Sequence, residues 1–342
     1  MKLKFVVIAI TTISLFCLGT ASAQKAKYIP DQPTATEKQV NGWDGKLTLG
    51  ASVSLSQSSN FVGQIDGTAF SLGFNVDSAL KYLKNEHEWR NSLTLADMFT
   101  LTPVVDSFVK TNDILALESI YLYHIKAIPW FGPFFRLQFD TAIFPGEDVR
   151  AAAVDYQITA LNGNVNTQNA AKLHLTDSFS PLTLRETLGL FAKPIAKKTI
   201  AVEFKAGFLA RQTFAKNQRA VDDDSKTAQI EIITLDNVIQ GGPSAGVIVD
   251  GSLVEDRLLY KVLGEAMIPV VTNQGETDNR SAGELTNVNL AAHLSVKIFS
   301  WASLDYQFRA VREPQLIDKF QIQNNLLLTF SYSLIKSKAD SK

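Results

Sequence analysis

The sequence predicts an all-β chain that folds as a transmembrane, antiparallel, up-and-down β-barrel of about twelve strands. Three observations predict this fold. Apolar and polar residues alternate with a period of two in twelve segments, the connections between segments alternate between short and long, and a secretion signal precedes them. Strands of roughly 9–11 residues with this pattern, in an exported chain, are typical of membrane barrels.

The N-terminal segment has the three parts of a secretory signal peptide. Two lysines form its charged start, an apolar core follows at 5–18, and small residues at 21–23 precede a cleavage site. A transmembrane anchor is the alternative, but the apolar run is too short for one. We therefore expect cleavage after a 1–23 signal, which leaves a flexible periplasmic segment over 24–42 before the barrel at 43–335 and a polar tail at 336–342.

Cysteine usage and charge narrow the class of protein. The only cysteine, Cys17, lies in the predicted signal, so the exported chain would have no disulfide. The 33 Lys and Arg residues nearly balance the 34 Asp and Glu residues, which gives no reason to expect nucleic-acid binding. No later apolar run reaches about 18 residues, so a membrane-embedded chain would have to be a closed barrel, which leaves no strand edge in lipid.

Each predicted strand carries apolar residues at alternate positions. In the tenth strand, Val288, Leu290 and Leu294 alternate with Asn289 and His293, so one face is apolar and the other polar. The fourth strand differs because it is apolar on both faces. The predicted strands lie near 43–56, 70–82, 89–95, 115–125, 135–143, 182–190, 200–210, 245–253, 258–268, 288–298, 302–310 and 322–334.

The connections between the strands fall into two classes by parity. Even-numbered strands are followed by short connections that suit tight turns, and odd-numbered strands by longer ones, the largest near 145–181, 214–243 and 270–286. Bacterial outer-membrane barrels have short periplasmic turns and long external loops, so this alternation places both termini in the periplasm. Residues alternate again at 154–158 and near 230–232, where we expect external hairpins. Two extra spanning strands, giving fourteen, are the alternative.

All four tryptophans mark the same predicted end of the barrel. Trp43, Trp89, Trp130 and Trp301 begin the first, third, fifth and eleventh strands. Amphipathic rings favour the interface between membrane and water, so these residues predict an aromatic girdle. Ordinary core aromatics would have no reason to share one end.

Charged residues on the polar faces predict the lining of the lumen. A charge facing lipid near the membrane centre would cost about 2–4 kcal/mol, so inward placement is favoured. Twelve strands lie between small filled barrels and large open ones, so both an aqueous channel and a lumen closed by ion pairs remain open. The near-equal signs favour a paired network and argue against a strongly ion-selective pore. The predicted lining residues are Arg136, Asp140, Glu203, Lys205, Lys261, Glu265, Lys297, Asp305 and Arg309.

Other candidate sites are weak. Glu118 and Glu186 fall on mainly apolar faces, so each marks either a different register or an unusual lumen site. His293 and Ser295 share a face and could form part of a membrane-embedded hydrolase, although such a pair is common on strands. The acidic turn at 222–225 lacks the spacing and glycine of a calcium loop. We expect no catalytic residue, metal site or cofactor, since the histidines lack metal-ligand spacing and no phosphate-binding motif occurs.

Several segments resemble a family of uncharacterised bacterial outer-membrane barrels, a domain of unknown function. They are DILALESIYLY at 113–123, RLQFDTAIFPG at 136–146, FSPLTLRETLGLFAKP at 179–194 and DKFQIQ at 318–323. The resemblance implies an outer-membrane barrel, with membrane lipid and the barrel-insertion machinery as partners, but no substrate or catalytic residue. One departure is that Leu334 and a polar tail stand where barrels of this kind usually end on an aromatic residue.

The leading functional prediction is therefore a passive channel or small-solute transporter in a Gram-negative outer membrane, with the solute left open. A structural or surface-interaction barrel with a plugged lumen is the alternative, and a membrane-embedded hydrolase comes third.

Overall fold

The computed structural model describes residues 41–58, 67–103, 105–224, 226–273 and 280–335. The predicted signal peptide and the predicted C-terminal tail lie outside the described residues, as does all but the end of the N-terminal segment at 24–42. Within the described part of the chain there is no helix that could span a membrane.

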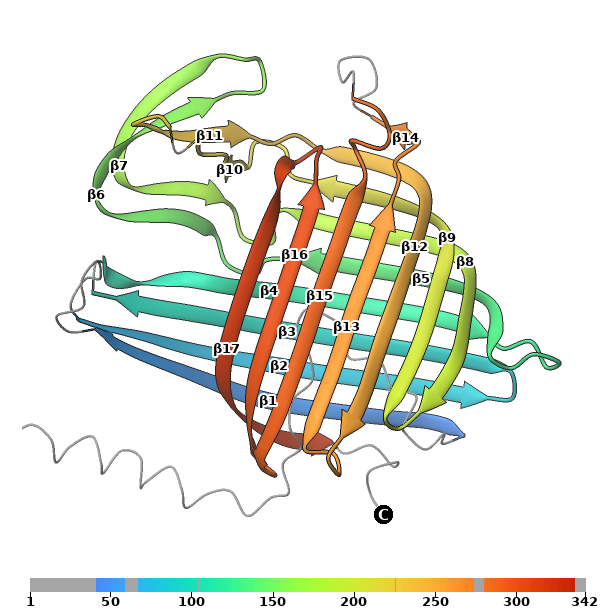
Figure 1. The fold of residues 1–342 in the computed structure, drawn as a ribbon. Coiled ribbons are helices and arrows are strands. Elements are labelled where there is room, and N and C mark those ends of the chain that lie inside the picture. Colours follow the sequence, from blue (N-terminus) through green and yellow to red (C-terminus); the bar gives the residue numbers. More distant parts are fainter. Residues whose placement is uncertain (1–40, 59–66, 104, 225, 274–279, 336–342) are drawn as a thin grey trace, which may run out of the picture.

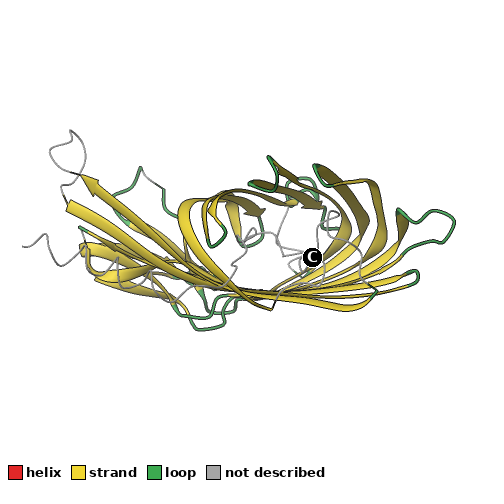
Figure 2. Cartoon of the chain, turned by 90° about the horizontal axis from the view of Figure 1, so that it is seen from below, coloured by secondary structure: helices red, strands yellow, loops and turns green. Residues whose placement is uncertain are grey.

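Twelve antiparallel strands close into a barrel, which confirms the predicted fold (Figures 1 and 2). The ring closes where β12 pairs with β13, so every barrel strand has two neighbours and no edge is left. Strands of the β1–β4 wall cross those of the β13–β17 wall steeply, as tilted barrel strands do (Figure 1). The barrel strands are β1 (Gly42–Ser58), β2 (Gly67–Lys84), β3 (His87–Thr102), β4 (Val105–Tyr123), β5 (Phe131–Thr141), β8 (Leu182–Lys197), β9 (Ile200–Phe214), β12 (Val238–Leu253), β13 (Leu258–Met267), β15 (Asn287–Phe299), β16 (Ala302–Glu313) and β17 (Ile317–Ile335).

The long connections hold a second, four-stranded sheet that stands off one end of the barrel (Figure 1). It consists of β6 (Gly146–Thr159), β7 (Val165–Thr176), β10 (Arg219–Val221) and β11 (Ile230–Thr234). Its own apolar core contains Tyr156, Ile158, Leu173 and Ile232, all buried. The alternating residues at 154–158 and 230–232 therefore form hairpin strands outside the barrel, and the fourteen-strand alternative is wrong. A further short strand, β14 (Val271–Thr272), pairs with β12.

The two ends of the barrel differ in their connections. We call the end with turns at 85–86, 124–130, 198–199, 254–257 and 300–301 the short-turn end, and the opposite end the long-loop end. At the long-loop end, 103–104 and 314–316 are also short, contrary to the prediction of a longer piece after every odd strand. The reason is that both strand pairs stay hydrogen-bonded to their ends. The β3–β4 pair continues to Thr102 and Val105 through two bulges, and the β16–β17 pair continues to Glu313 and Ile317 through one register shift.

The alternation separates an apolar outside from a polar inside. Large apolar side chains point outward and are exposed on every wall, among them Leu72, Leu188, Phe204, Val262 and Leu326. The inner face carries small polar side chains that are buried, including Ser52, Thr94, Ser295 and Thr329. The polar core of the molecule is therefore the lumen, and the candidate site lies there.

Candidate functional site

The structure places all nine predicted lining residues on the inner face of the barrel. Arg136, Glu203, Lys205, Lys261 and Asp305 are buried, and Asp140, Glu265, Lys297 and Arg309 are partly buried. They do not form one cluster. They divide between the short-turn half, the middle and the long-loop half of the lumen.

The short-turn half holds a dense ion-pair network. Arg90 on β3 contacts Glu88 at 2.8 Å and, across the lumen, Glu203 on β9 at 3.2 Å. Glu203 also pairs with Lys205, and Glu88 pairs with Lys81 at 2.9 Å. Strands β3 and β9 are four positions apart around the barrel, so the Arg90–Glu203 pair spans the interior.

An apolar cluster lies inside the lumen beside this network. Ile120, Leu122, Phe134 and Phe191 come from β4, β5 and β8 and are all fully buried. His124 joins the two groups, since its ring lies edge-on to Phe191 at 5.1 Å and its Nε2 lies 2.8 Å from a Glu88 oxygen. The second apolar face of the fourth predicted strand is thus explained, because Ile120 and Leu122 point into the lumen.

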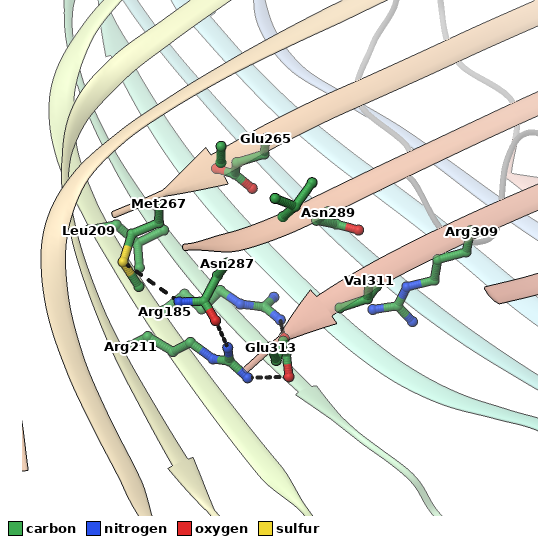
Figure 3. Close-up of a pocket in the computed structure, with 12 residues that line it drawn as sticks. Arg185, Leu209, Arg211, Glu265, Met267, Asn287, Asn289, Arg309, Val311 and Glu313 are labelled. Carbon is green, nitrogen blue, oxygen red and sulfur yellow. Dashed lines mark hydrogen bonds and ion pairs between the residues drawn. The ribbon is translucent and has the colours of Figure 1, made fainter. Parts of the chain in front are cut away.

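The long-loop half is crossed by a second set of pairs. Arg211 on β9 contacts Glu313 on β16 at 2.5 Å, and Arg185 on β8 contacts Asp140 at 2.5 Å and Glu313 at 4.0 Å. Figure 3 shows Arg185 and Arg211 converging on Glu313 around a small pocket of about 40 Å³. Between the two halves, Arg136 pairs with Glu265.

Above these pairs lies a cavity of about 700 Å³, which we call the mouth cavity. Inner-face residues of β4, β5, β8, β9, β16 and β17 form its wall, and Arg219, Ala220 and Leu235 reach it from the long loops. Hydroxyl groups recur around it, from Thr111, Thr141, Thr176, Thr183 and Thr213. A cavity of this size and polarity can hold a small polar solute.

Sequence reasoning missed several lumen residues. Glu88 lies just before the third predicted strand, and Arg90, although inside that strand, was not assigned to the lumen, nor were Arg185 and Glu313. The signal for Arg185 was present, because Leu182, Leu184, Leu188 and Leu190 occupy the even positions of β8 and leave the odd ones inside.

Glu118 and Glu186, which fall on mainly apolar faces in the sequence, lie on opposite sides of the barrel wall. Glu118 is buried on the inner face and accepts a hydrogen bond from Gln138 at 2.8 Å, so it is a lumen residue. Glu186 shares the outward face of Leu184 and Leu188, where Gln212 lies 3.5 Å from its carboxylate. The expectation that Glu186 is either a register error or a lumen site is wrong, because the register holds and the side chain faces out.

The serine and histidine of the hydrolase hypothesis do not form a catalytic arrangement. His293 and Ser295 both face Asp305, with His293 Nε2 at 3.4 Å from a carboxylate oxygen, and Ser295 is fully buried. No hydrogen bond joins Ser295 to His293, so this base would not activate this hydroxyl. The acidic turn is also accounted for in part, since Asp222 pairs with Lys319 at 2.6 Å. Among the described residues, no group of three or more potential metal ligands occurs.

The four tryptophans lie at the short-turn end with their rings exposed. Trp43 packs near Trp89 and Tyr82, with ring centroids 6.0 and 4.9 Å away, and Trp301 stacks on Phe299 at 5.2 Å. Trp130 is 51% exposed at the start of β5. Together they form a belt of outward-facing rings at one level of the wall.

No family model matches the chain, and no curated protein matches it, so the resemblance to a domain-of-unknown-function family stays a prediction. Solved structures similar to the chain include the β domain of the Bordetella autotransporter Brka (11% identity, 84% of this chain and 99% of that one, TM-score 0.34). Others are an outer-membrane channel from Pseudomonas putida F1 (10%, 88% and 98%, TM-score 0.36) and the translocator domain of the autotransporter NalP from Neisseria meningitidis (9%, 86% and 89%, TM-score 0.34). These values are too low to assign a function.

Proposed function

We propose that the chain is a passive channel for small polar solutes in the outer membrane of a Gram-negative bacterium. The apolar outer wall and the belt of tryptophans support insertion into lipid, because the rings lie where an interface would be. The same belt supports an orientation with the short-turn end and both chain termini in the periplasm. Membrane lipid and the insertion machinery are then the expected partners, and cleavage after residue 23 is the expected processing.

The observation that carries the proposal is the mouth cavity above ion pairs. The cavity gives a solute room inside the lumen, and the constriction below it consists of side chains, since Arg211, Glu313 and Arg90 extend from the wall. Side chains exchange partners and rotamers without breaking backbone ladders, so the path can open while the barrel stays folded. A plug made of folded backbone would not have this property.

Conductance in planar lipid bilayers tests the proposal. Refolded protein should give discrete conductance steps, small for a barrel of this size because pairs cross the lumen. Liposomes containing the protein should also admit small sugars. Correctly folded protein that neither conducts nor admits solute would overturn the channel.

Cysteine labelling of intact cells tests the orientation. The only natural cysteine lies in the predicted signal, so the exported chain offers no background. Asn162 and Asn85 are matched turn residues at the long-loop and short-turn ends. A membrane-impermeant maleimide should label Asn162→Cys and leave Asn85→Cys unlabelled. The reverse pattern would invert the topology.

A surface-interaction barrel is the second candidate, and the sheet of β6, β7, β10 and β11 favours it. This sheet has its own buried core and therefore persists as a rigid platform beyond the barrel. Bilayer recordings distinguish the two candidate functions, because only a channel is expected to conduct. Removing the platform should abolish the function of a surface protein, whereas a channel without it should still conduct.

A further inference from the structure

The mouth cavity is lined by charged side chains of both signs. Three arginines and three carboxylates line it: Arg185, Arg219, Arg309, Asp113, Asp140 and Glu313. Two more cations pair with these carboxylates, since Lys110 contacts Asp113 at 2.7 Å and Arg211 contacts Glu313 at 2.5 Å. Glu265 lies beside Arg185 and Arg309 in the small pocket, so among the described residues five cations at or next to the cavity stand against four carboxylates, an excess of one positive charge.

The carboxylates are already engaged by protein groups. Asp113 accepts hydrogen bonds from Lys110 and from the backbone N–H groups of Ile143 and Phe144. Asp140 is held by Arg185, and Glu313 lies between Arg211 and Arg185. These acids have little capacity left for a cationic solute, which would have to displace a guanidinium or an ammonium group.

Arg219 also lines the cavity but differs from the other arginines, because its position is fixed by its main chain and not by contacts of its side chain. It belongs to β10, where its main chain pairs with Thr234 of β11, and its side chain makes no ion pair or hydrogen bond with any described residue. Its donors can therefore point into the cavity without first breaking a contact. Guanidinium donors match carboxylate and phosphate oxygens in geometry as well as charge.

We infer that the mouth cavity binds small oxyanions, solutes carrying a carboxylate or phosphate group, in preference to cations and neutral sugars of the same size. The inference rests on the proposed channel for its transport role, but the binding site itself needs only the cavity. The acidic turn outside does not cancel the excess, because Asp222 is paired with Lys319 and exposed charges are screened within about 8 Å at physiological salt.

Two variants isolate the effect of the cavity charge. Arg219→Gln removes one lining charge, and it lies outside the barrel strands, so the barrel does not depend on it for folding. Lys216→Gln removes the same charge from an exposed residue nearby in the same loop that does not line the cavity. Both proteins should refold and insert like the wild type.

The first measurement is the zero-current potential across a bilayer under a potassium chloride gradient. We expect the wild type to prefer chloride by roughly threefold to tenfold. Arg219→Gln should at least halve this preference while conductance persists, and Lys216→Gln should leave it unchanged. A conducting wild type with no anion preference, or an equal loss in both variants, would overturn the inference and leave the channel standing.

The second measurement does not require conductance. Calorimetry of the full chain in detergent micelles should detect binding of gluconate and of inorganic phosphate but not of glucose, which matches gluconate in size. Arg219→Gln should weaken binding roughly tenfold, the loss of about one charge-assisted hydrogen bond. A protein that binds gluconate but does not conduct would overturn the channel alone. Equal binding of glucose and gluconate would overturn the oxyanion site.

Discussion

The two halves of the lumen are built from the same alternating strands but are filled in different ways. The short-turn half is solid, because Ile120, Leu122, Phe134 and Phe191 pack together beside the Arg90–Glu203 pair. The long-loop half keeps a cavity of about 700 Å³ bordered by hydroxyls and charges. The difference teaches that strand number alone does not set the bore of a barrel, because the inward side chains decide how much of it is open.

The largest expected effect comes from breaking the cross-lumen pair in the solid half. Arg90→Leu leaves Glu88 and Glu203 buried with fewer cationic partners, so the free energy of unfolding should fall by about 3 kcal/mol. Arg150→Leu is a matched control, because Arg150 pairs with Asp148 two residues earlier on β6 just as Arg90 pairs with Glu88 on β3. Arg150 is 40% exposed, so its loss should cost about 0–1 kcal/mol.

Urea unfolding followed by tryptophan fluorescence measures both variants. We expect Arg90→Leu to lower the free energy of unfolding clearly more than Arg150→Leu does, since the Arg90 pairs are buried in the lumen and the Arg150 pair lies on the sheet outside the barrel. Equal losses would mean that Glu203 is adequately neutralised by Lys205 and that the solid half does not depend on Arg90.

The second effect is on conductance and comes from the apolar cluster. Phe191→Ala removes a fully buried ring from the apolar cluster inside the lumen. Apolar constrictions in pores exclude water, so we expect single-channel conductance to rise at least about twofold. Phe204 sits beside Phe191 on the neighbouring strand, paired with Ala192, but points outward. Phe204→Ala should therefore leave conductance unchanged.

Bilayer recordings of the two phenylalanine variants decide where the barrier lies. If Phe191→Ala conducts no better than the wild type, the limiting barrier is elsewhere. The ion pairs of the long-loop half, where Arg211 contacts Glu313, would be the next place to examine.

Much of the fold could be predicted from the sequence because alternation is a local property. The alternation of Val288, Leu290 and Leu294 shows which face of the strand is apolar without reference to any other strand. The tryptophans indicate one end of the barrel even when the strand pairing is unknown. The paths of β3 and β4 could not be predicted, because bulges interrupt the period while backbone hydrogen bonds continue. Main-chain hydrogen bonds between strands cannot be inferred from the polarity of the side chains.

The candidate site was less predictable because its pairs are not local. Arg90 and Glu203 are 113 residues apart, and their contact depends on which strands face each other across a closed ring. The near-equal signs of the predicted lining residues did not indicate which charges pair, because the pairs divide between the two halves of the lumen. The role of Arg219 could not be predicted, since it lies on β10 in a long connection that reaches the mouth cavity.

The smallest expected effect is a pH dependence at the short-turn end. The Lys198 ammonium, 2.6 Å away, and the Ser252 hydroxyl hold the pKa of Asp256 below its ordinary value. A carboxyl whose pKa is lower in the folded state stabilises the fold above its unfolded pKa of about 3.9 and loses that contribution as the pH falls through the folded value. Because the Asp256 side chain is 44% exposed, the contribution should stay below about 1 kcal/mol.

Asp256→Asn should therefore lower the free energy of unfolding slightly at pH 7, and its deficit relative to the wild type should shrink toward pH 3. Glu255→Gln is the control, because Glu255 is exposed in the same turn and makes no side-chain contact with a described residue. Urea titrations at the two pH values measure the difference. A deficit that persists undiminished at pH 3 would mean that the asparagine disturbs the turn itself, where residues 254–256 all have positive φ, and that the charge of Asp256 contributes nothing.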